Sequence, residues 1–87
     1  MDLRGLNYFS VVAEELNFTR AAQRLCMSQP PLSNQIKALE EELGTPLFLR
    51  GGRTLQLTEA GKVLYRRAAQ LLDLAERTQE ELSLIHI

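Results

Sequence analysis

The stretch that decides the fold is residues 18–39, which read FTRAAQRLCMSQPPLSNQIKAL and contain two short helical patterns joined by a tight turn. Ala21, Ala22 and Leu25 give the first pattern a small, closely packing face, and residues 26–28 are too few to form a loop. In the second pattern, apolar residues recur at the spacing of one helix face and predict a single buried stripe. This stripe consists of Leu32, Ile36, Leu39 and Leu43.

The opposite face of the second pattern carries short or polar side chains. It consists of Pro30, Ser33, Asn34 and Lys37. A helix-turn-helix needs this combination, because its second helix lies in the major groove of DNA and presents short polar side chains to the base edges. The stretch therefore predicts a DNA-binding protein.

Over residues 1–84 the sequence resembles the N-terminal DNA-binding module and linker helix of the LysR-type bacterial transcriptional regulators. The resemblance rests on a long, ordered set of residues along most of the chain. The set comprises Leu3, Leu6, Phe9, Phe18, Thr19, Ala21-Ala22, Leu25, Ser28-Gln29-Pro30, Leu32-Ser33, Gln35-Ile36, Leu39-Glu40, Leu43-Gly44, Leu47-Phe48, Arg50, Arg53 and Leu57-Thr58-Glu59-Ala60-Gly61.

Two positions depart from the usual pattern of that family, since Cys26 stands where His is common and Asn34 where Arg is common. The resemblance implies a winged helix-turn-helix, a dimerising linker helix and a role in transcription. It also implies that a complete member continues into a ligand-sensing domain of two α/β lobes. A small-molecule effector would bind only in that C-terminal domain, and tetramers would form in a full-length parent.

The length of 87 residues indicates one domain. A globule of this size buries only about 60–65% of its unfolded surface, so part of its apolar surface is expected to meet a partner subunit. The hydrophobic content of 45% excludes a disordered tail. No run approaches the ~20 apolar residues of a membrane span.

The compartment is expected to be the cytoplasm, with the protein associated with the nucleoid. The start, MDLRGL, has no basic segment followed by an apolar one, so no secretory signal is evident. A single cysteine excludes an intrachain disulfide and suits a reducing environment.

The net charge of −1 alone argues against a nucleic-acid partner, for which a basic balance is expected. The distribution of charge reverses this conclusion, because no acid occurs in residues 17–38 or 44–57. The bases in these segments are Arg20, Arg24, Lys37, Arg50 and Arg53. We therefore expect a basic face, with modest DNA affinity for a monomer, because counterion release scales with the number of phosphates neutralised.

The first helix is expected to span Leu3–Glu15, with its apolar face formed by Leu6, Phe9, Ala13 and Leu16. Thr19 is the expected N-cap of a short helix over residues 20–25.

The second helix of the motif is expected to begin near Ser28 or Gln29. If Ser28 caps this helix, Pro30 and Pro31 occupy the positions whose N–H would bond to the serine oxygen, so its hydroxyl stays free. Gly44 and Pro46 are expected to end the helix.

Residues 47–50 and 54–57 read as two short strands around Gly51-Gly52, which predicts a hairpin or wing. A last helix is expected from its N-cap, Thr58, to about Leu84. Its apolar residues follow alternating steps of four and three, typical of a contact between two helices, so we expect it to pair with its copy in a second subunit. The predicted seam consists of Leu64, Ala68, Leu71, Ala75, Thr78, Leu82 and Ile85.

Together these elements predict a mostly α winged helix-turn-helix, with three helices and a short β-hairpin wing, followed by a long dimerisation helix. Residues 1–57 are expected to form the DNA-binding domain and residues 58–87 the linker helix. The ending SLIHI, residues 83–87, is apolar and uncharged and does not fit the pattern, so we interpret it as a truncation scar.

Several side chains of the motif are candidates for contact with base edges. The amides of Gln29 and Asn34 can pair bidentately with adenine N6 and N7 in the major groove. Pro30 and Pro31 either press on a thymine methyl group or only initiate the helix. The hydroxyls of the motif suit contacts with bases or phosphates. They belong to Thr19, Ser28 and Ser33.

Basic side chains are the candidates for phosphate contacts. Lys37 is expected to meet phosphate as a point charge on a flexible stem. Arg50 and Arg53 flank the Gly-Gly turn and would place guanidinium groups at a groove edge or a phosphate. Arg20 and Arg24 either do the same or pair with the acids at positions 14 and 15.

The remaining reactive residues predict no further site. Cys26 is expected to be a small buried hydrophobe rather than a redox centre. His86 is the only histidine and has no ligand partners nearby, so no metal site and no cofactor are expected. A Gly-rich phosphate loop, a Ser-His-Asp set and an inward-facing carboxylate pair are all lacking, so we expect no enzyme activity.

Two other classes of protein stay open at this stage. One is a different small winged-helix repressor, although nothing in the sequence forms a pocket for a ligand. The other is an interaction module in which the last helix is the functional part. Salt-dependent binding to promoter DNA separates the interaction module from both kinds of regulator.

Overall fold

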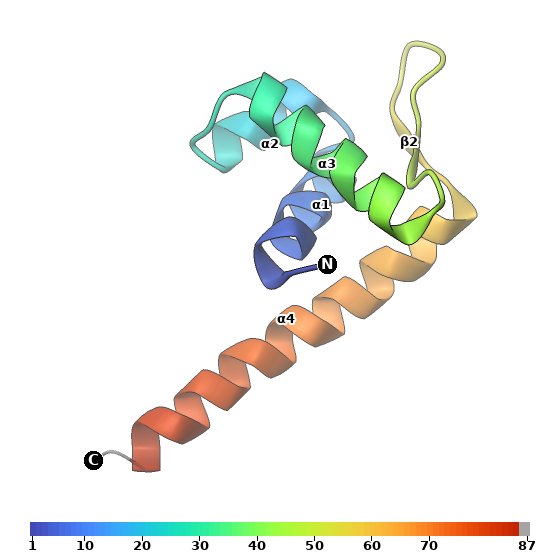
Figure 1. Ribbon diagram of the computed structural model, residues 1–87. Coiled ribbons are helices and arrows are strands. Elements are labelled where there is room, and N and C mark those ends of the chain that lie inside the picture. The colour runs from blue at the N-terminus through green and yellow to red at the C-terminus, as the bar shows by residue number, and fades with distance from the viewer. Residues whose placement is uncertain (86–87) are drawn as a thin grey trace.

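The computed structural model describes residues 1–85, which form four helices and a two-stranded antiparallel hairpin (Figure 1). This confirms the predicted mostly α winged helix-turn-helix. The elements are α1 (Leu3–Glu15), α2 (Phe18–Arg24), α3 (Gln29–Leu43), β1 (Phe48–Leu49), β2 (Gln56–Leu57) and α4 (Glu59–Ile85).

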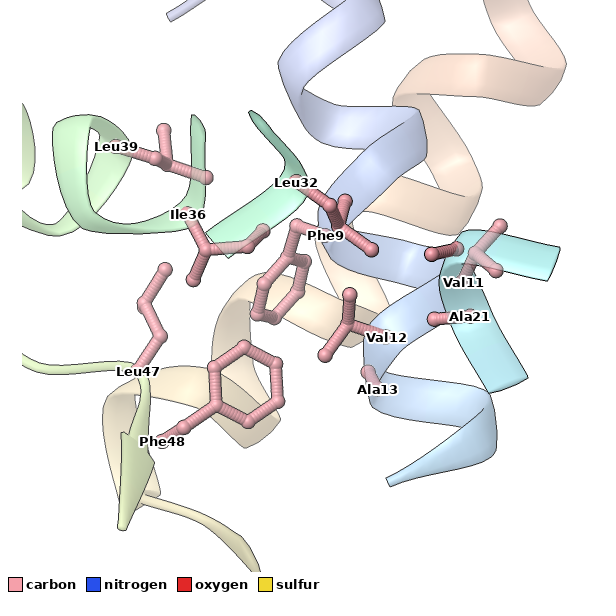
Figure 2. Close-up of a cluster of buried hydrophobic side chains, with 11 residues drawn as sticks. Phe9, Val11, Val12, Ala13, Ala21, Leu32, Ile36, Leu39, Leu47 and Phe48 are labelled. Atoms are coloured by element: carbon pink, nitrogen blue, oxygen red, sulfur yellow. The ribbon is translucent and has the colours of Figure 1, made fainter. Parts of the chain in front are cut away.

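The core lies where α1, α2, α3 and the base of the hairpin meet. Its largest fully buried side chains are Phe9, Val12, Leu32, Ile36 and Leu47. Figure 2 shows these side chains converging on the aromatic pair formed by Phe9 and Phe48, whose ring centroids are 5.5 Å apart. The core thus fixes α3 against both α1 and the wing.

The end of α1 differs from the sequence-based expectation at one residue. Asp2 caps the helix by accepting the N–H of Gly5 at 2.7 Å, and the apolar face through Leu6, Phe9 and Ala13 is buried as predicted. Leu16, however, is 40% exposed, because it is the C-cap residue in the left-handed conformation, with φ 50°. The chain turns away from the core at this point.

The prediction that Thr19 caps α2 is wrong. Asn17 is the N-cap, since its side chain accepts the N–H of Arg20 at 2.9 Å, and α2 starts at Phe18. The ring of Phe18 lies 6.1 Å from that of Phe48, so packing favours the earlier start. Thr19 consequently lies inside the helix, and its side chain is exposed.

Helix α3 begins and ends where the sequence predicted. Ser28 is its N-cap residue and makes no side-chain capping bond, as the two prolines implied. Gly44 ends the helix with φ 74°, a conformation that favours glycine. The buried stripe includes Leu32, Ile36 and Leu39 but stops there, because Leu43 lies in the last turn beyond the core and is 40% exposed.

The hairpin is shorter than predicted. Phe48 pairs with Leu57 and Leu49 with Gln56, and residues 50–55 form the loop. Glycine weakens a strand because it has no side chain to pack, so the pairing of the two strands does not extend to Gly51-Gly52. Figure 1 shows the loop projecting beside the C-terminal end of α3, away from the far end of α4.

Helix α4 is fastened to the wing at its first turn. Thr58 caps it as predicted, because its hydroxyl accepts the N–H of Gly61 at 3.0 Å. The same hydroxyl donates to the carbonyl of Pro46 at 2.8 Å, and the N–H of Thr58 donates to that of Leu47 at 3.0 Å. The close approach requires Gly61, since a Cβ there would overlap the carbonyl oxygen of Leu47.

The two halves of α4 have different surroundings. Its first half crosses α1, and its second half extends away from the other helices (Figure 1). Leu64 packs against the core and Ala68 is fully buried, so contacts within the chain already cover these two members of the predicted seam. Leu71 and Leu82 are 40% and 54% exposed. Within residues 1–85 no helix, α4 included, is long and apolar enough to cross a membrane.

Candidate nucleic-acid interface

The outer face of α3 is an exposed row of the predicted contact residues. Leu32 and Ile36 anchor the inner face with no exposed surface, so the outer side chains stand on a rigid support. The exposed members of the row are Gln29, Pro30, Pro31, Asn34 and Lys37, and Ser33 is half-buried beside them. An exposed row of amides on a fixed helix can meet base edges in a groove.

The outer row of α3 becomes acidic toward the end of the helix. Helical spacing places Glu41 on the same face as Asn34 and Lys37, and its side chain is exposed. A carboxylate there would repel DNA phosphates, so the part of α3 suited to a groove is its first two to three turns.

The turn before α3 contradicts the expectation for Cys26. This residue is exposed rather than buried, and its backbone has φ 54°. The left-handed conformation turns its side chain outward from the α2–α3 junction, where Ala22 and Met27 pack instead. Ser28, the next polar residue along the chain, is exposed next to the outer row.

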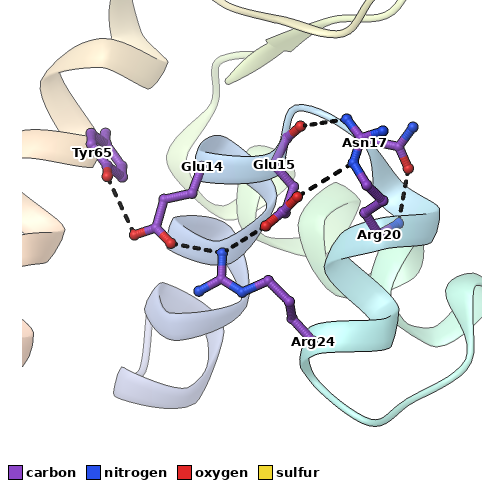
Figure 3. A network of polar contacts seen from close by, with 6 residues as sticks. All are labelled: Glu14, Glu15, Asn17, Arg20, Arg24 and Tyr65. Carbon is purple, nitrogen blue, oxygen red and sulfur yellow. Dashed lines mark hydrogen bonds and ion pairs between the residues drawn. The ribbon is translucent and has the colours of Figure 1, made fainter.

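Arginines on α2 are engaged by acids at the end of α1, as Figure 3 shows. The guanidinium Nη1 of Arg24 lies 2.9 Å from Glu14 and 3.1 Å from Glu15. Hydrogen bonds to these two carboxylates raise the pKa of Arg24 above its ordinary value. Arg20 lies 3.4 Å from Glu15 and also donates to that residue's carbonyl at 3.3 Å. Of the two alternatives for these arginines, the structure shows the pairing with acids.

The same network reaches α4 through Tyr65. Its hydroxyl donates to Glu14 at 3.3 Å, on the other side of that carboxylate from Arg24 (Figure 3). Burial, followed by the negative charge of Glu14, raises the pKa of the Tyr65 phenol above its ordinary value. The contact joins the linker helix to α1 and, through Arg24, to α2.

The two arginines of the wing differ in their surroundings. Arg50 forms an ion pair with Glu40 at 2.9 Å, and its guanidinium lies 5.7 Å from the centre of the Phe18 ring. Arg53 is exposed on the loop and makes no ion pair within residues 1–85. The expectation of a groove or phosphate contact therefore fits the position of Arg53 better than that of Arg50.

The basic face is smaller than the sequence predicted. Carboxylates engage Arg20, Arg24 and Arg50, and in the part of the chain that the structure describes only Lys37 and Arg53 of the five bases have no such partner. Arg20 keeps 62% of its side chain exposed and can still approach a phosphate. The acids that neutralise this face come from α1 and from the end of α3.

Glu40 is a buried side chain between α3 and the wing that sequence reasoning missed. It is 9% exposed, and its carboxylate accepts the backbone N–H groups of Leu47 and Phe48 at 2.7 and 3.3 Å. A signal for it existed in the sequence, because Glu40 borders the apolar stripe next to Leu39. Its partners could not be inferred, since they lie beyond a turn whose path depends on packing.

No group of three or more His, Cys, Asp or Glu side chains in residues 1–85 is placed to hold a metal ion. His86, which we expected not to be a ligand, lies outside the described residues. The candidate interface combines α3, the start of α2 and the wing, an arrangement typical of winged helix-turn-helix proteins.

Within that class, a sequence model described as "Bacterial regulatory helix-turn-helix protein, lysR family" matches residues 3–62. The chain therefore belongs to the LysR family of bacterial helix-turn-helix regulatory proteins. It is similar to the regulator BudR of Klebsiella aerogenes, with 56% identity over 81 residues that cover 93% of this chain and 57% of that protein. It is also similar to XapR of Escherichia coli (strain K12), with 59% identity over 71 residues that cover 82% of this chain and 24% of XapR.

Solved structures give the same result. The DNA-binding domain of BenM in complex with catB site 1 DNA has a TM-score of 0.95 and 45% identity, and the match covers 99% of this chain and 96% of that one. The complex of the CbnR DNA-binding domain with DNA has a TM-score of 0.95 and 40% identity, and the match covers all of both chains. The chain thus spans 24% of XapR and 57% of BudR, but almost all of the two solved DNA-binding domains.

Proposed function

We propose that this chain is the DNA-binding module of a LysR-type transcriptional regulator and acts on DNA in the cytoplasm. The observation that carries the proposal is the exposed row on α3, held by a fully buried inner face, in a fold that matches two domains solved in complex with DNA. In the proposed complex α3 lies in the major groove and the wing loop reaches the neighbouring backbone or groove.

The proposed contacts fall into two kinds. Base edges are met by the amides of Gln29 and Asn34, with Pro30, Pro31 and Ser33 filling the groove around them. Phosphates are met by Lys37 and Arg53, supported by hydroxyls and by Arg20. Those hydroxyls belong to Thr19 and Ser28. Arg50 is left out of these contacts, because its guanidinium pairs with the carboxylate of Glu40.

We also propose that two copies pair through the second half of α4. One side of this half exposes Leu71 and Leu82, with Thr78 between them and Leu74 at its edge. These side chains have nothing to cover them within residues 1–85, where α4 extends away from the other helices (Figure 1). The division into residues 1–57 and 58–87 is therefore one of function, since the first turns of α4 pack in the common core.

The charges on α4 favour an antiparallel pair. Its first half carries Lys62, Arg66 and Arg67, with Glu59 as the single acid. Its second half is acidic, with Arg77 as the single base. The acids are Asp73, Glu76, Glu80 and Glu81. A parallel pair would place like charges together, whereas an antiparallel pair that crosses near Leu71 lays the acidic second half of each helix along the basic first half of its partner.

The test is binding of the 87-residue chain to the duplex that it selects from a randomised library, measured by fluorescence anisotropy at several salt concentrations. Gln29→Ala should cost about 1–3 kcal/mol on the selected duplex and little on random DNA, because the amide reads a base. Lys37→Ala should weaken binding to all sequences alike and make the salt slope shallower by about one unit.

Equal loss on both DNAs would reassign Gln29 to a phosphate contact. A salt slope unchanged by Lys37→Ala would remove Lys37 from the interface. Failure of the wild-type chain to select any duplex would overturn the proposed function.

A further inference from the structure

We propose that Glu40 is a positioning residue for DNA recognition, which fixes the wing relative to α3 without touching DNA. The inference rests on the function proposed above. It names the side chain that sets the position of the wing relative to α3. Arg50, which the sequence suggested as a DNA contact, supports the wing together with Glu40.

The two oxygens of Glu40 hold different parts of the hairpin. Oε2 accepts the N–H groups of Leu47 and Phe48 at 2.7 and 3.3 Å, while Oε1 pairs with Nη2 of Arg50 at 2.9 Å. The acid lies in the last turn of α3, and these partners form the first strand and its flanks. One carboxylate, with 10% of its side chain exposed, thus ties the reading helix to the base of the wing.

Arg50 extends the connection to α2. Its guanidinium lies 5.7 Å from the centre of the Phe18 ring, and that ring lies 6.1 Å from the ring of Phe48 in β1. An arginine held between a carboxylate and an aromatic face has a fixed place and a neutralised charge. It is therefore poorly suited to serve as a phosphate contact.

The wing needs this support because its own ladder is short. Only Phe48–Leu57 and Leu49–Gln56 are paired, and an isolated hairpin is marginally stable even with more pairs than this. The loop over residues 50–55 carries Arg53 and includes Gly52 with φ 128°. A wing that already stands at the correct distance from α3 loses less conformational freedom when DNA binds.

The experiment is a set of double-mutant cycles on the selected duplex. Glu40→Gln keeps an oxygen for the two N–H groups but removes the charge that holds Arg50. Relative to Glu42→Gln, which makes the same charge change in the same turn of the helix at a carboxylate that pairs with the N-terminal amine rather than with the wing, it should weaken binding about tenfold. The loss should disappear in an Arg53→Ala background, because no wing contact is then left to position. It should persist in a Gln29→Ala background.

A general loss of structure would weaken binding equally in all backgrounds, so the selective coupling to Arg53 distinguishes positioning from folding. Nitrogen-15 relaxation of the free chain gives a second readout, in which Glu40→Gln should increase motion at residues 51–55 and leave α3 unchanged.

Arg50→Gln is the alternative variant if Glu40→Gln does not fold. It removes the ion pair but keeps the hydrogen bonds from the backbone of Leu47 and Phe48 to the carboxylate of Glu40. It should show the same coupling to Arg53 with an unchanged salt slope, whereas Arg53→Gln should make the slope shallower by about one unit. A slope change with Arg50→Gln, or equal losses with and without Arg53, overturns the inference while leaving DNA binding intact. A wild-type chain that selects no duplex overturns both.

Discussion

At the scale of the residue, the side chain of Asn34 is expected to set which base is preferred at one position of the DNA site. It is exposed in the middle of the outer row of α3, where an amide can match adenine and an arginine would prefer guanine O6 and N7. In the proposed complex, an asparagine at this position would have to lie closer to the base edge than an arginine, because its side chain is shorter.

We predict that Asn34→Arg shifts the base preference toward guanine at one position of each half-site and raises affinity for random DNA through its added charge. Selection from a randomised operator library measures the first effect. Gln35→Arg is the control, because Gln35 lines the hollow next to Asp2 and Gly5 rather than the outer row. It should raise affinity for random DNA without altering base preference. An unaltered preference with Asn34→Arg would mean that residue 34 does not meet a base.

Residue-scale features were predictable from sequence where they depend on neighbours along the chain. The free hydroxyl of Ser28 followed from two prolines, and the end of α3 followed from Gly44. The exposure of Cys26 and the pairing of Arg50 with Glu40 were not predictable, because each depends on the path of a turn fixed by tertiary packing. The contact residues themselves stay predictions until binding is measured.

At the scale of the element, the junction between the wing and α4 depends on one glycine. Alanine in place of glycine within a helix normally stabilises it by about 1 kcal/mol. At Gly61 the new Cβ would overlap the carbonyl oxygen of Leu47 and lie 2.9 Å from Cδ2 of Leu57. The overlap is with backbone, which cannot rotate away.

We therefore predict that Gly61→Ala lowers the free energy of unfolding by about 1–3 kcal/mol, as overpacking typically does. Urea denaturation followed by circular dichroism measures this quantity. Gly5→Ala is the matched control, since its Cβ would meet only the side-chain oxygen of Asp2 at 3.1 Å. A Gly61→Ala chain as stable as the Gly5→Ala chain would show that α4 can shift away from Leu47 without cost.

The helices were the most predictable elements, and their caps were less so. Thr58 was identified correctly because an N-cap serine or threonine before an acid is a local signal, whereas Asn17 outcompeted Thr19 through the packing of Phe18. The hairpin was overextended in prediction. Strands over residues 47–50 and 54–57 would leave a three-residue turn, whereas the loop spans residues 50–55, and the sequence pattern alone does not distinguish the two.

At the scale of the whole molecule, the proposed dimer should be sensitive to one leucine. Burying a leucine stabilises a contact by about 1.5–3 kcal/mol. In a symmetric dimer both subunits bury the same leucine, so its contribution counts twice. Leu71 is 40% exposed at the middle of α4, directly beyond the part that α1 covers. A glutamate there would bring two like charges together in a dry contact.

We predict that Leu71→Glu sediments as a monomer, keeps the fold of residues 1–57 and loses tight operator binding. The loss of affinity should be about 10²–10⁴-fold, because a dimer joins two half-site contacts into one bivalent encounter. Analytical ultracentrifugation and anisotropy provide the measurements. Leu84→Glu is the control, since it makes the same change at a 72% exposed site on a different side of α4. If the Leu71→Glu chain still sediments as a dimer, the pairing surface lies elsewhere.

The predicted seam on α4 shows that sequence periodicity can identify a buried side of a helix without identifying what covers it. The steps of four and three define one side of α4, yet periodicity alone does not distinguish a contact with α1 from a contact with a second subunit. Leu64 and Ala68 belong to the first kind in the structure. The distinction required knowing how far α1 reaches along α4.

The unequal surroundings of the two halves of α4 have a further consequence for how the molecule acquires its structure. The first half can form together with the core, because α1 and Tyr65's contact with Glu14 hold it within a single chain. The second half continues this helix but has no packing partner within residues 1–85, and helix propagation without packing is only marginally favourable in water. In the proposed dimer its ordering and the encounter with the second copy are therefore one event, so that cellular concentration sets not only how many pairs exist but how much of each chain is helical.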